Sequence, residues 1–176
     1  MKKPSVTQLI DLLDKPGLLK WANKLGLQGI NIDDKRKRSL ERGSSMHKQV
    51  EAVVLGTGAF ERELDAMSFA EFRKHCEIKE VEQAIETEWF VGRYDALVSV
   101  AGEDYIVDFK GGYKGKLYLD YKLQLVAYTM ARPAKMAVVP TPSFHFIPVD
   151  IADRRPYERI LICLSELWAL KKEIEQ

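Results

Sequence analysis

The sequence has few cysteines, no long hydrophobic run and almost no excess charge of either sign. Its two cysteines, Cys76 and Cys163, lie far apart in segments of helical pattern. This favours reduced thiols over a disulfide framework and excludes a four-cysteine metal cluster made by this chain alone. No apolar run approaches the roughly 18 residues of a membrane span, and no signal-peptide pattern is present. We therefore expect a soluble, intracellular, cytoplasmic protein that makes no membrane contact.

The near-neutral charge gives no global sign of a polyanionic partner, because the formal net charge is only +1. The cations are nevertheless clustered. Two basic groups stand out, Lys35-Arg36-Lys37-Arg38 and the later set Lys110, Lys114, Lys116 and Lys122. A solvated surface explains the first group as well as a binding function does. The second group carries more weight because of the residues beside it.

Hydrophobic periodicity predicts a single α/β domain over residues 1–176. A helical lead-in covers about 1–77. It consists of two short helices divided by Pro16-Gly17, a long helix at about 34–55, and a helix capped by Ser68. A sheet with one helix follows at about 79–149, and a last helix at about 155–175. The predicted strands are 81–89, 91–100, 104–110, 136–139 and 144–149, and the helix among them spans about 118–130. This order predicts a mixed central sheet flanked by helices.

The strands at 91–100 and 104–110 are predicted to form a hairpin that gathers acids and a lysine. A type II′ turn centred on Gly102-Glu103 places Asp95 opposite Lys110, and Leu97 opposite Asp108. Opposed residues share a face of the sheet, as do residues two apart, so both aspartates and the lysine project from one side. A slip of one residue would separate them. The register also collects an apolar set on the other face: Ala96, Val98, Val100, Tyr105, Val107 and Phe109.

Two carboxylates and an ammonium group on one face are compatible with a divalent metal site. Carboxylates that leave water need a cation, and Mg²⁺ or Mn²⁺ prefers oxygen ligands. A lysine two residues from a metal-binding acid can orient or deprotonate a water molecule, or stabilise charge on a phosphate. For the triplet alone, however, a salt bridge between Asp95 and Lys110 is the better interpretation.

Two further pairs with helical spacing accompany the hairpin. Gly43 and His47 are four residues apart, and so are Gln124 and Tyr128, so each pair shares one helix face. The second helix follows directly on the Gly/Lys-rich loop at 111–116, which places Gln124 and Tyr128 near the end of the preceding strand. A lone histidine is more often a packed or surface residue than a ligand. As a ligand, it would favour Mn²⁺ over strict Mg²⁺ selectivity.

Four short segments, in this order, resemble the RecB-type branch of the PD-(D/E)XK nuclease superfamily. They are Gly43-Ser44-Ser45-Met46-His47, Gly92-Arg93-Tyr94-Asp95, Asp108-Phe109-Lys110 and Gln124-Leu125-Val126-Ala127-Tyr128. The match spans about residues 39 to 130. Each segment is common by itself, but their order on a helix–strand–strand–helix framework is specific. Tyr94 stands where the motif's name has proline, which is a common departure in this branch.

The resemblance implies a restriction-endonuclease-like fold and a role for each matching residue at the reaction centre. Asp95 and Asp108 would bind the catalytic Mg²⁺ or Mn²⁺, together with the backbone carbonyl of Phe109. His47 would complete the coordination of the metal. Lys110 would serve the attacking water molecule. The resemblance therefore identifies Asp95, Asp108 and Lys110 as catalytic residues.

The resemblance also implies contacts with the substrate. Gln124 and Tyr128 would brace the site and contact the DNA strand. Lys114 and Lys116 could neutralise phosphates beside the cut. The cysteines that hold an iron–sulfur cluster in some relatives are absent, so that cofactor is not expected.

The expected function is that of a metal-dependent DNA exonuclease. It would hydrolyse phosphodiester bonds at DNA ends or in single strands, leave 5′-phosphates, and act in recombination, repair or phage DNA processing. A structure-specific endonuclease for flaps or junctions is the alternative. A nuclease-fold DNA-binding subunit without activity is a third reading, against which the intact acids and Lys110 argue. A recombination or single-strand-annealing protein is a conceivable partner, and the family includes both toroidal oligomers and monomers.

Overall fold

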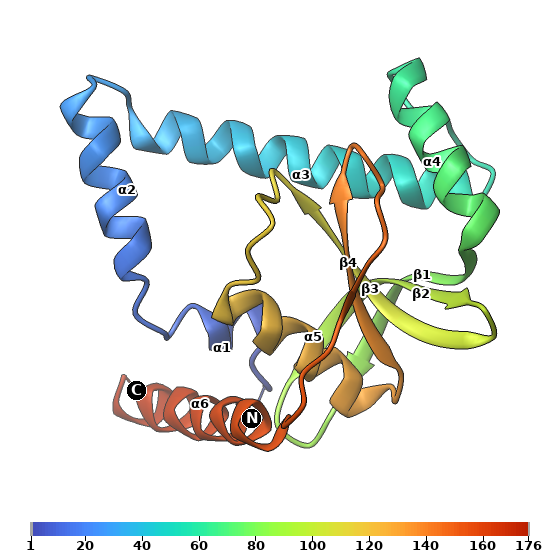
Figure 1. Ribbon diagram of the computed structural model, residues 1–176. Helices are drawn as coiled ribbons and strands as arrows, with labels where there is room; N and C mark the ends of the chain where they lie inside the picture. Colours follow the sequence, from blue (N-terminus) through green and yellow to red (C-terminus); the bar gives the residue numbers. More distant parts are fainter. Residues whose placement is uncertain (1, 176) are drawn as a thin grey trace.

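A computed structural model describes residues 2–175 and contains a five-stranded sheet with helices on both faces (Figure 1). The strands lie in chain order: β1 (Glu77–Glu86), β2 (Val91–Val100), β3 (Glu103–Gly111), β4 (Lys135–Thr141) and β5 (Ile147–Val149). Neighbouring strands are antiparallel except β3 and β4, which are parallel and joined through a helix. The predicted mixed sheet flanked by helices is confirmed.

The described residues form six helices: α1 (Val6–Ile10), α2 (Pro16–Leu27), α3 (Ile32–Val54), α4 (Glu63–His75), α5 (Leu119–Ala131) and α6 (Arg155–Ile174). Helices α1, α5 and α6 bury their apolar residues against one face of the sheet, and α3 and α4 cover the other. Helix α3 crosses one end of the molecule, and α2 lies beyond its N-terminal half (Figure 1). None of these helices is both long enough and apolar enough to cross a membrane.

Helix α3 is the element that carries His47. It begins at the N-cap Asn31, whose side chain accepts hydrogen bonds from the backbone N–H groups of Asp33 and Asp34. These two acids also lie in the first turn, where they complement the positive end of the helix dipole. Only Val50 is fully buried in its 23 residues. The helix therefore packs through its C-terminal half and leaves its N-terminal half exposed.

The apolar face predicted for the hairpin is confirmed. Four of its six residues are buried against α3 and α4, and the other two, Val100 and Tyr105, pack at the edge of the same cluster. The four buried residues are Ala96, Val98, Val107 and Phe109. With one face anchored in this way, the other face of the hairpin is determined as well.

The predicted hairpin turn is wrong by one residue. Its central residues are Ala101 and Gly102, not Gly102 and Glu103, because Val100 pairs with Glu103. Both central residues have positive φ, 51° and 83°. This is the type I′ geometry, whose twist matches that of the flanking strands. Ala101 adopts it in spite of its Cβ atom, which explains why a turn with glycine first was expected.

The corrected turn moves the register by two residues and leaves the faces unchanged. The last β2–β3 pair is Ala96–Val107, so the next residues along the two strands are Asp95 and Asp108. The predicted register had placed Lys110, not Asp108, opposite Asp95. Residues two apart on a strand share a face. Asp95, Asp108 and Lys110 therefore still belong to one side, as predicted.

Two other local predictions are wrong. Ser68 is not an N-cap, because α4 begins five residues earlier at Glu63. The Ser68 hydroxyl donates a hydrogen bond to the Leu64 carbonyl instead, which satisfies a serine inside a helix. In addition, β1 begins at Glu77 and ends before Trp89, which lies in the following loop. In both places polar residues at the end of the element interrupt the hydrophobic pattern from which the boundary was predicted.

Candidate functional site

Three acidic residues lie at one level across β1, β2 and β3. The neighbours of Glu82 on β1 pair with the neighbours of Asp95 on β2, so these two acids lie opposite each other. Asp108 follows the last β2–β3 pair at the same level. Asp95 is 8% exposed and Asp108 is 1% exposed. The sheet therefore gathers carboxylates at a point that is largely closed to water.

The regular alternation of side chains between the two faces of the sheet is interrupted in β1 and β2 at this level. Val81 and Ala96 belong to the apolar cluster under α3 and α4, whereas Ile85 and Tyr94 pack on the side of α1, α5 and α6. Glu82 lies at the change, with a φ of 49°. Residues other than glycine rarely occupy this left-handed region, and such outliers concentrate at functional sites.

His47 of α3 completes a group of possible metal ligands. Its Nδ1 atom lies 3.6 Å from Oε1 of Glu82 and 3.5 Å from Oδ1 of Asp95. Its Nε2 atom lies 3.0 Å from the carbonyl oxygen of Phe109. With the proton on Nε2, the imidazole donates to this carbonyl and leaves Nδ1 free, as metal-binding histidines do. Ligand atoms of His47, Glu82 and Asp95 all lie within 4.8 Å of one another, so they could hold a metal ion.

The Phe109 peptide group fixes two of these ligands. Its N–H donates a 2.6 Å hydrogen bond to Oδ2 of Asp95, which leaves Oδ1 facing His47. Its carbonyl oxygen accepts the hydrogen bond from His47. The expected role of this carbonyl as a metal ligand thus competes with a bond that orients His47. Phe109 is placed at the site, and both of its backbone groups are engaged there.

Asp108 lies beside this group but is not one of its three members. The Nζ atom of Lys110 lies 2.8 Å from Oδ2 of Asp108. In the part of the chain described, this oxygen nevertheless receives no hydrogen bond of good geometry. A buried carboxylate oxygen without a donor is costly, and a nearby cation would satisfy it.

A chain of side-chain hydrogen bonds holds Lys110 from α5. Lys110 Nζ donates to Oε1 of Gln124 at 2.9 Å, and Nε2 of Gln124 donates to the hydroxyl of Tyr128 at 2.8 Å. The ring of Tyr121 lies 4.7 Å from the same ammonium group. Gln124 and Tyr128 therefore reach the site, as their spacing predicted. Tyr128 is only 4% exposed, so here it braces Gln124.

Burial and mutual repulsion change the acidity of the group. Burial and the charge of Asp108 raise the pKa of Asp95 from 3.8 to about 7. Burial also raises the pKa of Asp108, although the charge of Lys110 opposes this. Burial lowers the pKa of His47, but Glu82 and the charge of Asp95 raise it overall to about 9. The fold therefore disfavours the ionised form of both aspartates, and a bound divalent cation would favour it.

Two predicted substrate residues are not brought to this group. Lys114 and Lys116 are exposed in the loop that follows β3. Lys116 lies 5.2 Å from the ring centre of Tyr118. Among the described residues, no hydrogen bond or ion pair joins either lysine to the acids. Their role depends on a substrate that reaches beyond the metal group.

Glu82 is the site residue that sequence reasoning missed. Strand β1 contains four glutamates at 77, 80, 82 and 86, and nothing local distinguishes the third. Its side chain also lies 3.8 Å from the guanidinium of Arg93. The only available signal was its position one strand away from Asp95. Using that signal would have required the β1–β2 register.

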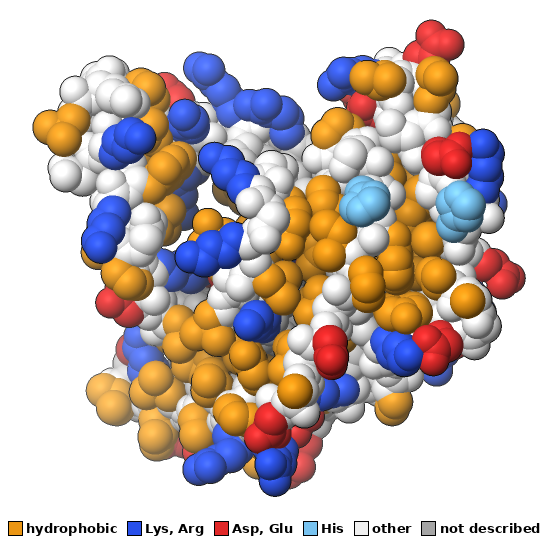
Figure 2. Space-filling model, viewed as in Figure 1, with side chains coloured by type: hydrophobic (Ala, Val, Ile, Leu, Met, Phe, Trp, Pro, Cys, Tyr) orange, Lys and Arg blue, Asp and Glu red, His pale blue; other side chains and the backbone are white. Residues whose placement is uncertain are grey.

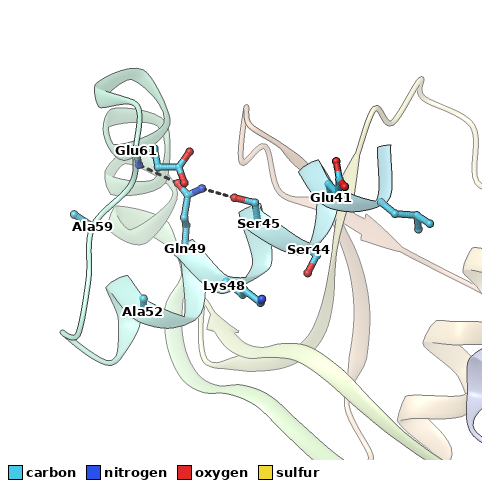
Figure 3. Close-up of a pocket in the computed structure, with 9 residues that line it drawn as sticks. Glu41, Ser44, Ser45, Lys48, Gln49, Ala52, Ala59 and Glu61 are labelled. Carbon is cyan, nitrogen blue, oxygen red and sulfur yellow. Dashed lines mark hydrogen bonds between the residues drawn. The ribbon is translucent and has the colours of Figure 1, made fainter. Parts of the chain in front are cut away.

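A hollow lies along α3, and the metal group is not part of its lining (Figure 3). Its volume is about 620 Å³, between α3 and the segment before α4. Gln49 crosses it, donating to the Ser45 hydroxyl at 2.9 Å and accepting from the Glu61 backbone N–H at 3.0 Å. Gln49 is thus satisfied by protein partners, and this hollow brings no acid cluster together.

Comparison with known proteins adds little. No protein-family model matches the chain, and no curated protein sequence matches it. Among solved structures, the crystal structure of SSO0001 matches 94% of this chain and 76% of that chain, at 18% sequence identity and a TM-score of 0.46. A match this loose says nothing about what the chain does.

Proposed function

We propose that the chain is a metal-dependent DNA exonuclease of the RecB type. The observation that carries this proposal is the meeting of Glu82, Asp95 and Asp108 at one level of the sheet, with His47 and Lys110 beside them. A salt bridge would need one acid and one base. It would need neither a histidine oriented by a backbone carbonyl nor a lysine held by a hydrogen-bonded chain.

The residues present fit a divalent ion. His47, Glu82 and Asp95 would hold it, and the unsatisfied oxygen of Asp108 lies close enough to the group for its charge to act on His47. Oxygen ligands suit Mg²⁺ and Mn²⁺, and the imidazole favours Mn²⁺. When bound, the ion would lower the pKa of a water molecule and stabilise negative charge on a phosphate.

Lys110 would act on the phosphate and on the attacking water as a positioned cation. Burial lowers its pKa, but the charge and contact of Asp108 raise it overall, so the side chain stays protonated at neutral pH. A protonated lysine can orient water and stabilise charge but cannot accept a proton. In the proposed reaction a water oxygen bonds to phosphorus and the bond to the 3′ oxygen breaks. The water loses a proton to solvent and the leaving 3′ oxygen takes one up, so a 5′-phosphate and a 3′-hydroxyl remain.

An assay of DNA topology and metal dependence tests this function. Linear single- and double-stranded DNA labelled at its ends would be compared with covalently closed single-stranded circles, in Mg²⁺, in Mn²⁺ and in EDTA. We expect shortening of linear DNA in either ion, no cleavage in EDTA, and survival of the circles. Circles cut as fast as linear strands would support a structure-specific endonuclease. Binding without cleavage of any substrate would support an inactive DNA-binding subunit.

A further inference from the structure

Gly43 lies near the middle of α3, one turn before His47, and has no structural reason to be glycine. Glycine destabilises a helix interior relative to alanine. Gly43 is not among the described residues with positive φ, so the backbone conformation does not require it. No heavy atom outside its own helix turn lies within 4 Å of where a Cβ atom would stand, so packing does not require it either.

The open space at Gly43 lies on the same helix face as His47. The two residues are four apart, so they are one turn, about 6 Å, from each other along the helix. Arg36 falls on the same line two turns further toward the N-terminus, because eleven residues make about three turns. Arg36 is exposed, and it has no ion-pair partner in the chain from 2 to 175. One face of α3 thus presents a cation, a bare backbone and a metal ligand in sequence.

The surroundings leave room for a polymer to reach this face. Strand β3 ends beside His47, since the Phe109 carbonyl bonds to the imidazole, and the loop with Lys114 and Lys116 follows directly. Figure 2 shows the surface hollowed between α2 and this loop, below α3, with Lys and Arg side chains around the hollow. A chain of phosphates is the ligand that suits a row of cations leading to recessed acids.

We propose that the face of α3 formed by Arg36, Gly43 and His47 holds the sugar–phosphate backbone of one nucleic-acid strand as it leads to the metal group. Gly43 is the point of closest approach, and Arg36 pairs with a phosphate on the uncut side. This proposal rests on the proposed nuclease function and names its substrate as a single strand. A line one residue wide fits one phosphate chain, and the recessed Asp95 and Asp108 are reached more readily by one separated strand than by both strands of a duplex.

Gly43→Ala separates stability from function. We expect the melting temperature to rise by about 2 °C, because alanine favours the helix and meets no neighbour. Cleavage of a linear single strand, and its binding without divalent ion, should each fall about tenfold or more, because the new methyl group displaces the backbone. Gly26→Ala is the matched control. Gly26 also lies in a helix with nothing within 4 Å, so its alanine variant should cleave and bind like the wild type.

Arg36→Gln and Arg38→Gln test whether the charge on this face of α3 contributes to strand binding. Both arginines are exposed on α3, but Arg38 lies about 200° around the helix axis from Arg36 and so belongs to the opposite face. Replacing Arg36 should weaken strand binding and reduce the slope of log Kd against log salt by about 1. Replacing Arg38 should leave that slope closer to the wild-type value.

The outcomes distinguish this proposal from the nuclease function. If the wild type cleaves and Gly43→Ala cleaves and binds equally well, the strand does not follow this face, and the nuclease function stands. A drop in melting temperature for Gly43→Ala would overturn the premise of open space. If the wild type cleaves nothing, the nuclease function fails. Weaker binding of a single strand by Gly43→Ala and Arg36→Gln would then still support strand binding along this face of α3, and unchanged binding would refute it.

Discussion

Two regions of the molecule leave charge uncompensated, and they do so with opposite signs. At the centre of the sheet, Glu82, Asp95 and Asp108 are buried or half-buried acids, and one oxygen of Asp108 receives no hydrogen bond of good geometry from the described residues. Along the N-terminal half of α3, the cations at 35–38 and 42 are exposed and have no ion-pair partner among residues 2–175. Several exposed ions elsewhere do pair, as Lys79 does with Asp104 at 2.6 Å.

The difference between these regions is one of cost. A buried carboxylate without full compensation destabilises the fold and persists only where something else offsets it. An exposed unpaired cation costs little, because water and salt screen it. We therefore expect changes at the sheet to have large effects on stability, metal binding and activity. Replacing the exposed cations along α3 should hardly affect stability.

The largest expected effect is on catalysis, from removing the one cation that the sheet holds against Asp108. Lys110→Ala should reduce cleavage in Mn²⁺ by about 10²- to 10⁴-fold, because it removes the ammonium group held between Asp108 and Gln124. Metal binding, measured by calorimetry, and the circular dichroism spectrum should be retained. Lys79→Ala, at an exposed pair, is the control and should cleave normally. Full activity of Lys110→Ala would remove this lysine from the chemistry.

Much of this inner region could be predicted from the sequence because strands alternate with a period of two. The turn was misplaced by one residue, yet the resulting error of two residues in the register kept Asp95, Asp108 and Lys110 on one face. The i, i+4 spacing on α5 likewise placed Gln124 and Tyr128 together. Local periodicity therefore determined most of the site.

Glu82 could not be predicted because its position depends on a break in that same periodicity. Its left-handed φ of 49° marks the level at which β1 changes face, and only the pairing with β2 brings it opposite Asp95. His47 was expected as a metal ligand, but its hydrogen bond to the Phe109 carbonyl depends on long-range packing of α3. Contacts across the sheet and between layers leave no trace in a local pattern.

The second prediction removes negative charge from the sheet. Asp95→Asn should lower the affinity for Mn²⁺ at least about tenfold and stabilise the metal-free protein at pH 8 by on the order of 2 kcal/mol. The asparagine can still accept the hydrogen bond from Phe109, so the fold loses little. Calorimetry and urea denaturation measure the two effects. Asp104→Asn, at an exposed acid, should leave the metal affinity unchanged, and equal affinity in both variants would contradict the site.

The third prediction concerns pH in the absence of metal. Burial and Asp108 raise the pKa of Asp95 to about 7 in the folded state, so stability falls as pH rises from about 4 to 7. The raised pKa of His47, about 9 against 6.5, gives stability that is full below 6.5 and lost toward 9. Both effects have the same sign. Melting temperature should therefore fall from pH 5 to pH 9.

Metal should reverse this dependence, since a bound cation favours ionised acids and neutral imidazole. The increase in melting temperature caused by saturating Mn²⁺ should be larger at pH 8 than at pH 6. Asp95→Asn should flatten the metal-free profile between pH 5 and pH 7. A metal-free melting temperature that stays constant or rises across this range would show that the acids are not held uncompensated.

The smallest expected effect separates paired from unpaired surface cations. Lys79→Gln breaks the exposed pair with Asp104 and should destabilise the protein by no more than about 0.5 kcal/mol. Lys37→Gln removes an unpaired cation from a basic run, so it should have no cost and could relieve repulsion. Urea denaturation at low and high salt measures both, and salt should erase the difference between the variants. A larger loss of stability for Lys37→Gln than for Lys79→Gln would mean that the cations of α3 interact with groups inside the fold. Their exposure would then give no support to an external binding partner.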